Sequence, residues 1–156
     1  MSEKEEEIRI GVFVCHCGSN IGGLIDCKSI AEYAKTLPNV KFTIDYLYTC
    51  SETGLAQIKN GIKEYNLNRV IVASCTPRTH EPLFRDCVEA EGVNEYLFNF
   101  VNIRDQLTWA HQKHPKEAFE KAKDLIRMGV AKAAKLEALE NITVDATPTA
   151  IVIGGG

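Results

Sequence analysis

Three apolar runs that each end in cysteine constrain the fold of this 156-residue chain most strongly. The runs are GVFVCHC at 11–17, IDYLYTC at 44–50 and RVIVASC at 69–75. Each run has the β-branched and aromatic composition of a buried strand, and each is followed by a helix-like segment. Because strands that alternate with helices build a parallel sheet, their carboxyl ends lie along one edge. The sequence therefore predicts a doubly wound α/β fold with a mostly parallel, four-stranded sheet, flanking helices and a long C-terminal helix.

The expected elements alternate along the chain. Strands are expected at about 8–14, 40–48, 69–73 and 96–101. Helices are expected at 26–37, 103–111 and 115–140. A further helix is expected to begin after Ser51 as its N-cap, to run to residue 65 and to stop at Asn66. Another is expected to have Pro82 in its first turn and to end at residue 92. The pattern predicts a single α/β domain over residues 1–140.

The last residues have a different character. Residues 149–153 are apolar and β-branched, and they run directly into Gly154, Gly155 and Gly156. A strand that ends in glycines is how a dinucleotide-binding unit begins. We expect residues 141–156 to be a linker and the truncated first strand of a downstream domain.

Composition narrows the function classes. A net charge of −3 gives no reason to expect nucleic acid or an anionic membrane surface as a partner. No apolar run approaches the length of a membrane span, and the start, MSEKEEEIRI, is acidic where a signal peptide is basic. A cytoplasmic location is expected, where six cysteines are typical of metal or redox sites rather than of structural disulfides.

Four of the cysteines form the candidate site. Cys15, Cys17, Cys50 and Cys75 are distant in sequence, but each follows a strand, so all four are expected at the sheet edge where ligands bind. Four thiolates suit an iron–sulfur cluster or a structural zinc ion. The residues alone leave zinc, [2Fe–2S] and [4Fe–4S] open. A thiol–disulfide enzyme using Cys15 and Cys17 is a weaker hypothesis, because it leaves the other two cysteines unexplained.

The surroundings of these cysteines favour thiolate chemistry. Each lies just before an expected helix N-terminus, which predicts a lowered thiol pKa. Arg78 and His80 are expected to add positive charge around the site, with a solvent-facing loop as the alternative. Hydrogen bonds to sulfur are expected from Thr49, Ser51, Ser74, Thr76 and the Gly18 amide.

The remaining cysteines and histidines rank lower. Cys27 is a reserve ligand, because it lies near the same edge, whereas Cys87 is expected to be a buried apolar side chain within a helix. His16 is expected to face solvent or to lie just outside the site. His111 and His114 are expected to be a surface pair, because no third ligand accompanies them.

A family resemblance is carried, in order, by the segments VFVCHCGSNIGG, DYLYTCSETG, LNRVIVASCTPRTHEPLFR, YLFNFVNIRDQLTWAH and AKDLIRMGVAKA. Together they resemble the N-terminal region of the A subunit of heterodisulfide reductase, an iron–sulfur flavoprotein of methanogenic archaea with relatives in sulfate reducers. The segment TAIVIGGG resembles the first strand of that family's flavin-binding domain.

The resemblance implies an electron-transfer domain within a flavin-based bifurcating enzyme. It implies that Cys15, Cys17, Cys50 and Cys75 are ligands of one [4Fe–4S] cluster. The residues themselves keep a zinc-binding structural or docking module as the alternative. The resemblance also implies that FAD binds only the full-length protein, so the isolated domain is expected to have no catalytic activity. The implied partners are the other heterodisulfide reductase subunits, a hydrogenase or formate dehydrogenase, and ferredoxin. A homodimer is a separate expectation, because the apolar strand at 149–153 has no partner strand in this chain and can pair with a second copy.

Overall fold

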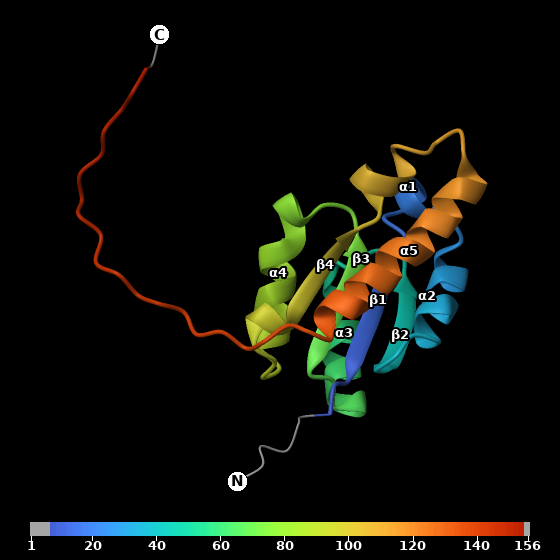
Figure 1. Ribbon diagram of the computed structural model, residues 1–156, viewed down its shortest axis with the longest axis horizontal. Helices are drawn as coiled ribbons and strands as arrows, with labels where there is room; N and C mark the ends of the chain where they lie inside the picture. The colour runs from blue at the N-terminus through green and yellow to red at the C-terminus, as the bar shows by residue number, and fades with distance from the viewer. Residues whose placement is uncertain (1–6, 155–156) are drawn as a thin grey trace.

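A parallel sheet forms the centre of the molecule, which is seen in a computed structural model that describes residues 7–154 (Figure 1). Its four strands lie in the order β2-β1-β3-β4, and every neighbouring pair is parallel. The strands are β1 (Ile10–Cys15), β2 (Val40–Tyr46), β3 (Arg69–Ser74) and β4 (Phe98–Asn102). The α/β fold class expected from the alternation of strands and helices is confirmed.

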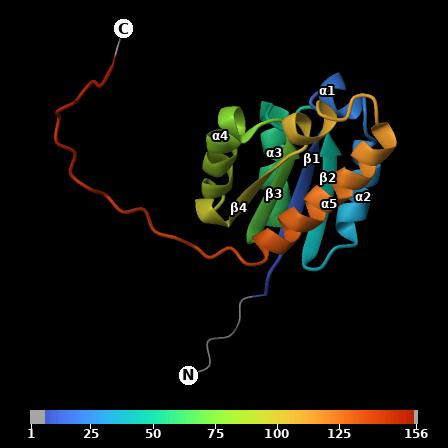
Figure 2. The same cartoon turned by 45° about the horizontal axis from the view of Figure 1, so that its top comes forward.

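Helices cover both faces of this sheet (Figures 1 and 2). Helices α2 (Cys27–Lys35) and α5 (Pro115–Ala133) pack on one face, and α3 (Glu52–Tyr65) and α4 (Pro77–Glu89) pack on the other. Alternation along β1 supplies both cores, because Val12 and Val14 face α2 and α5 whereas Phe13 faces α3 and α4. The sheet is therefore buried on both sides, as continuous apolar runs require.

Helix ends follow the capping residues in the sequence. Ser51 caps α3 by accepting a hydrogen bond from the Gly54 amide at 3.1 Å, and Asn66 ends that helix in the left-handed conformation at φ 49°. Asp26 caps α2 in the same way, accepting from the Ser29 amide at 3.2 Å. The predicted roles of Ser51 and Asn66 are confirmed.

Two predicted helix boundaries are wrong. Helix α4 begins at Pro77, which takes the first helical position where a missing amide is harmless, so Pro82 lies inside the helix and not in its first turn. Helix α5 ends at Ala133 and does not reach residue 140. Beyond Ala133 the backbone turns away, because the carbonyl of Leu136 accepts from Arg69 Nη2 at 3.2 Å instead of from a later amide of the same helix.

Smaller elements modify the connections. A one-turn helix, α1 (Ser19–Gly22), follows β1, and a short 3₁₀ helix (Glu95–Leu97) replaces the expected start of β4. The expected helix at 103–111 is a π-helix (Arg104–Thr108). Within the described residues no helix has both the length and the apolar character needed to cross a bilayer.

The expected strand at 149–153 is not formed. Residues 136–154 have no regular secondary structure, and the tail extends away from the sheet in Figure 1. Ile151, Val152 and Ile153 are almost fully exposed. The division into a domain at 1–140 and a downstream linker and strand stays a prediction.

The strand order creates one switch point at the carboxyl edge. From β1 the chain passes to β2 on one side, and from β3 it passes to β4 on the other side. The direction of winding therefore changes between β1 and β3. In open α/β sheets ligands bind at this switch point, outside the carboxyl ends of the two strands.

Candidate metal centre

The four predicted ligand cysteines lie around this switch point. Cys15 is the last residue of β1 and Cys17 follows two residues later, while Cys75 comes directly after β3. Cys50 lies beyond β2, which pairs with β1, just before the start of α3. The thiols interact electrostatically: Cys15 and Cys75 act on both Cys17 and Cys50, and Cys17 acts on Cys50. The fold thus brings together residues that are up to sixty positions apart in sequence.

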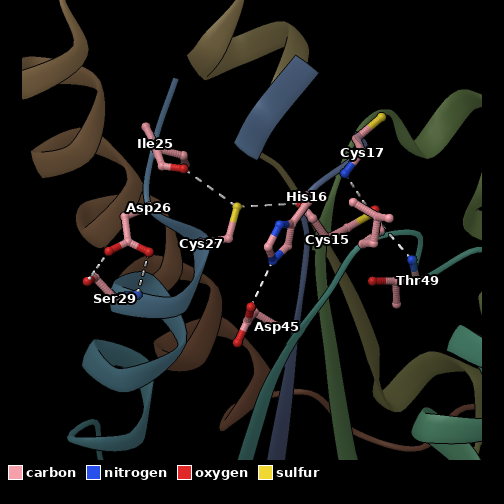
Figure 3. A network of polar contacts seen from close by, with 10 residues as sticks. Cys15, His16, Cys17, Ile25, Asp26, Cys27, Ser29, Asp45 and Thr49 are labelled. Carbon is pink, nitrogen blue, oxygen red and sulfur yellow. Dashed lines mark hydrogen bonds and ion pairs between the residues drawn. The ribbon is translucent and has the colours of Figure 1, made fainter. Parts of the chain in front are cut away.

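The sulfur of Cys15 accepts hydrogen bonds from two backbone amides (Figure 3). The Cys17 amide lies 3.3 Å and the Thr49 amide 3.4 Å from Cys15 Sγ. Cys17 reaches this position in the left-handed conformation at φ 49°, followed by Gly18 at φ 57°. Amide hydrogen bonds stabilise negative charge on sulfur, so this loop is shaped to support a thiolate.

Burial disfavours the charged forms of Cys17 and Cys50 before any cation binds. It is the largest cause that raises the pKa of Cys17 and of Cys50, and the neighbouring thiols raise both further. The lowered pKa expected from the helix N-termini is therefore wrong for these two residues. Desolvation and mutual repulsion outweigh the helix dipole here, as expected for several thiols gathered at one partly buried place.

A cation that sequence reasoning missed lies beside Cys17. Arg104, at the start of the π-helix after β4, donates from Nη1 to Cys17 Sγ at 3.7 Å. One signal was present in the sequence, because Arg104 follows a strand of the same parallel sheet and so belongs to the same edge. Arg78 is exposed and His80 is half-buried on α4, and within residues 7–154 neither makes a hydrogen bond or ion pair with a cysteine. Their role around the site stays a prediction.

Two buried hydroxyl groups at this edge have no partner. Thr49 and Ser74 are each 1% exposed, and within the part of the chain that the structure describes neither Thr49 Oγ1 nor Ser74 Oγ makes a hydrogen bond. They precede Cys50 and Cys75 directly. A buried hydroxyl without a partner is costly and often marks a missing ligand. Among the described residues, however, no three His, Cys, Asp or Glu side chains are arranged around one metal ion.

The donor set fits an iron–sulfur cluster by its chemistry. It consists of four thiols from three strand ends, two amides aimed at a sulfur, two hydroxyls with free donors and one guanidinium. A four-iron cluster takes one cysteine on each iron, so its ligands need not meet at one point. All six cysteines are free thiols, which leaves the four available.

The two other cysteines are turned into the protein core. Cys27 is 2% exposed, and its thiol faces the carbonyl oxygens of Ile25 at 3.8 Å and Cys15 at 4.0 Å (Figure 3). Burial, then the charge of Asp45, raises the pKa of Cys27 to about 12. Cys87 packs in the core beneath α3 and α4, where it faces the Leu55 carbonyl at 3.8 Å. Its predicted burial is confirmed.

The histidines make local contacts. His16 Nε2 lies 2.8 Å from Asp45 Oδ2, which joins the end of β1 to the end of β2 outside the thiols (Figure 3). His111 Nδ1 lies 2.8 Å from the Leu107 carbonyl oxygen, and the exposed His114 lies 3.8 Å from Glu117. These contacts agree with the expected surface pair.

Comparison with known proteins gives several close matches. The chain is 58% identical over 152 residues to the second of two A-type iron-sulfur subunits of CoB–CoM heterodisulfide reductase in Methanopyrus kandleri. It is 55% identical over 154 residues to the A subunit of the H(2):CoB-CoM heterodisulfide,ferredoxin reductase of Methanothermobacter thermautotrophicus. It is 53% identical over 152 residues to an Archaeoglobus profundus protein named as similar to the heterodisulfide reductase A subunit. No family model matches the chain.

The matches cover nearly all of this chain but little of each relative. They include 97% of the chain in the first and third cases and 99% in the second. The same alignments span only 22–23% of the relatives' own length. The chain is therefore homologous to a segment of the heterodisulfide reductase A subunit, and the resemblance is confirmed.

Proposed function

We propose that this chain is an electron-transfer domain that binds one [4Fe–4S] cluster within the A subunit of a heterodisulfide reductase. The proposed ligands are Cys15, Cys17, Cys50 and Cys75. The observation that carries the proposal is that these four cysteines lie around the switch point of the sheet, beside two buried hydroxyls that have no hydrogen-bond partner among the described residues.

The chain's own residues would bind and stabilise the group. Four thiolates would hold the irons, and the amides of Cys17 and Thr49 would stabilise charge on the Cys15 sulfur. The hydroxyl of Ser74 would gain an acceptor that residues 7–154 do not supply. When bound, the cluster would supply one-electron transfer, which no side chain at this edge performs alone.

The names of the relatives support the setting. One is named an iron-sulfur subunit of a CoB–CoM heterodisulfide reductase, and another belongs to a heterodisulfide,ferredoxin reductase. We propose that the full protein takes part in flavin-based electron bifurcation in methanogenesis, with FAD bound outside this segment. Its partners would be the other reductase subunits, ferredoxin, and a hydrogenase or formate dehydrogenase. The isolated segment would carry electrons without reducing the heterodisulfide.

Anaerobic reconstitution with iron and sulfide tests the proposal. Wild-type protein should take up four irons and four sulfides per chain and become brown, with absorbance that bleaches on reduction, as a Cys₄ cluster requires. Cys50→Ala and Cys75→Ala should each lose most of the iron, because each removes a ligand from a different strand end. Cys87→Ala is the matched control, because Cys87 lies within α4 and its thiol faces the Leu55 carbonyl oxygen.

Two results would contradict the proposal. Stoichiometric cluster in Cys50→Ala or Cys75→Ala would remove that residue from the ligand set. Colourless protein that binds one zinc per chain, with zinc lost in the same variants, would establish the zinc module as the function of this edge.

A further inference from the structure

Arg104 is held against the candidate site from a strand end that contributes no cysteine. Its Nη1 lies 3.7 Å from Cys17 Sγ, and its side chain is only 19% exposed. It begins the π-helix after β4, an irregular element that often marks functional sites. Figures 1 and 2 place this segment beside α1, which follows the cysteine loop of β1.

Two contacts fix the position of the guanidinium group, and a third fixes the backbone of Arg104. Arg104 Nε donates to Asp105 Oδ1 at 3.0 Å, and the Trp109 ring centroid lies 4.4 Å from Arg104 Cζ. The Arg104 amide donates to Asn102 Oδ1 at 3.1 Å. The planar guanidinium is thus stacked on one side and hydrogen-bonded along its edge, which leaves Nη1 to face the sulfur.

The same network closes on the loop that carries Cys17. Trp109 Nε1 donates to Asn20 Oδ1 at 3.3 Å, and Asn20 Nδ2 donates to the Cys17 carbonyl at 3.3 Å. These contacts therefore form a closed ring between two strand ends, which runs through Arg104, Trp109, Asn20 and Cys17. Such a ring keeps the positive charge and the sulfur at a fixed separation.

We infer that Arg104 raises the reduction potential of the cluster by holding a fixed positive charge against the Cys17 ligand. The inference rests on the proposed function. One electron enters from a one-electron donor and later leaves to an acceptor, and no bond or proton is transferred in that step. The added electron makes the cluster one charge more negative, so a nearby cation stabilises the reduced state more than the oxidised state.

Asp105 opposes this effect. Its carboxylate binds Nε, on the part of the guanidinium that does not face the sulfur, and it is more exposed than the arginine, at 36% against 19%. The arginine charge is closer to the cluster ligand and less screened by water, so its influence should be the larger of the two. The two residues predict shifts of opposite sign.

The test measures the midpoint potential by dithionite titration of the reconstituted chain, followed by EPR, with iron content determined for every variant. In R104Q we expect the equilibrium for reduction to fall about tenfold, a shift of about −59 mV for one electron. R104K keeps the charge and should retain most of the potential, whereas D105N should shift it upward. R127Q is the matched control, because Arg127 is an exposed arginine of α5 that pairs with Asp124 and contacts no cysteine among the described residues.

The outcomes separate the inference from the proposed function. Full iron content with an unchanged potential in R104Q would overturn the inference and leave the cluster site standing. If R104Q loses iron, D105N carries the test, and an unchanged or lowered potential there would overturn the inference. Wild-type protein that takes up no iron and sulfide would overturn both. A shift in R127Q as large as in R104Q would also refute it, because the effect would then reflect overall charge.

Discussion

Cys27→Ala should change the pH dependence of stability in the metal-free protein. Cys27 is the first residue of α2 and is 2% exposed, and its thiol faces the carbonyl oxygens of Cys15 and Ile25. Burial and the nearby Asp45 charge disfavour its thiolate, which raises the pKa from 9.0 to about 12. The unfolded chain has no such environment, so its thiol ionises near the ordinary value.

The sign follows from linkage. A folded-state pKa above the unfolded value contributes stability that is complete below pH 9 and is lost progressively as the pH rises toward 12. One pH unit above the unfolded pKa, the loss is about 1.4 kcal/mol. Between pH 8 and pH 10 the wild-type protein should therefore lose about 1.4 kcal/mol more stability than Cys27→Ala, because alanine has no proton to release.

Urea unfolding of both proteins at pH 8 and pH 10, with chelator and reductant present, measures this difference. Lysines, tyrosines and the other thiols titrate in both proteins, so their contributions cancel in the comparison. A wild-type minus Cys27→Ala difference that is equal at the two pH values would refute the reasoning and would mean that the Cys27 thiolate is tolerated in the fold.

The same pKa bears on the role of Cys27 as a reserve ligand. A metal ligand must be a thiolate, and a pKa of about 12 in place of 9.0 makes ionisation harder by about 4 kcal/mol. A bound cation would have to offset that free energy and also move the sulfur away from the two carbonyl oxygens that it faces. This argument places Cys27 below the four cysteines at the switch point.

Three further predictions concern the frame of the site. Cys87→Ala should leave the visible spectrum of the reconstituted protein unchanged and cost about 1 kcal/mol in urea unfolding, since it trims one buried atom; a colourless variant would contradict the ligand set. Gly129→Ala should destabilise the protein by about 1–3 kcal/mol in the same assay, because a Cβ there would lie 2.6 Å from Val101 Cγ2; a stabilised variant would show that α5 can move away from β4. Removing the residues after Asn141 should leave the melting temperature and iron content unchanged, because residues 142–154 are exposed; a loss of iron would place the tail within this domain.

Much of the fold could be predicted because local signals and the global topology agree. The apolar runs gave the strands to within a few residues, and Ser51 and Asn66 act at the helix ends where their side chains predict. The convergence of Cys15 and Cys75 at one edge followed from the rule that strands alternating with helices are parallel, whereas the strand order was not predicted. These predictions need only periodicity and turn chemistry.

The boundaries that failed depend on contacts between distant segments. Helix α5 was expected to continue because LEALE is a good helical sequence. In the fold, Asn94 Nδ2 donates to the Leu139 carbonyl at 2.9 Å and Asn141 Nδ2 donates to Glu95 Oε1 at 2.9 Å. These bonds hold the chain in an extended path across the start of β4, and no local pattern near residue 139 announces them.

The charges around the candidate site also depend on contacts between segments that are distant in sequence. Arg78 and His80 were predicted to add charge around the site; they are residues of α4, which begins at Pro77, and their role stays a prediction. Arg104 lies 87 residues from Cys17 in sequence and still contacts it, because β4 ends at the same edge as β1 and β3. In a parallel sheet, the residues that follow neighbouring strands lie at the edge where ligands bind. A search for charges near a cysteine site of this kind should therefore begin with the residues just after every strand, including strands that carry no cysteine.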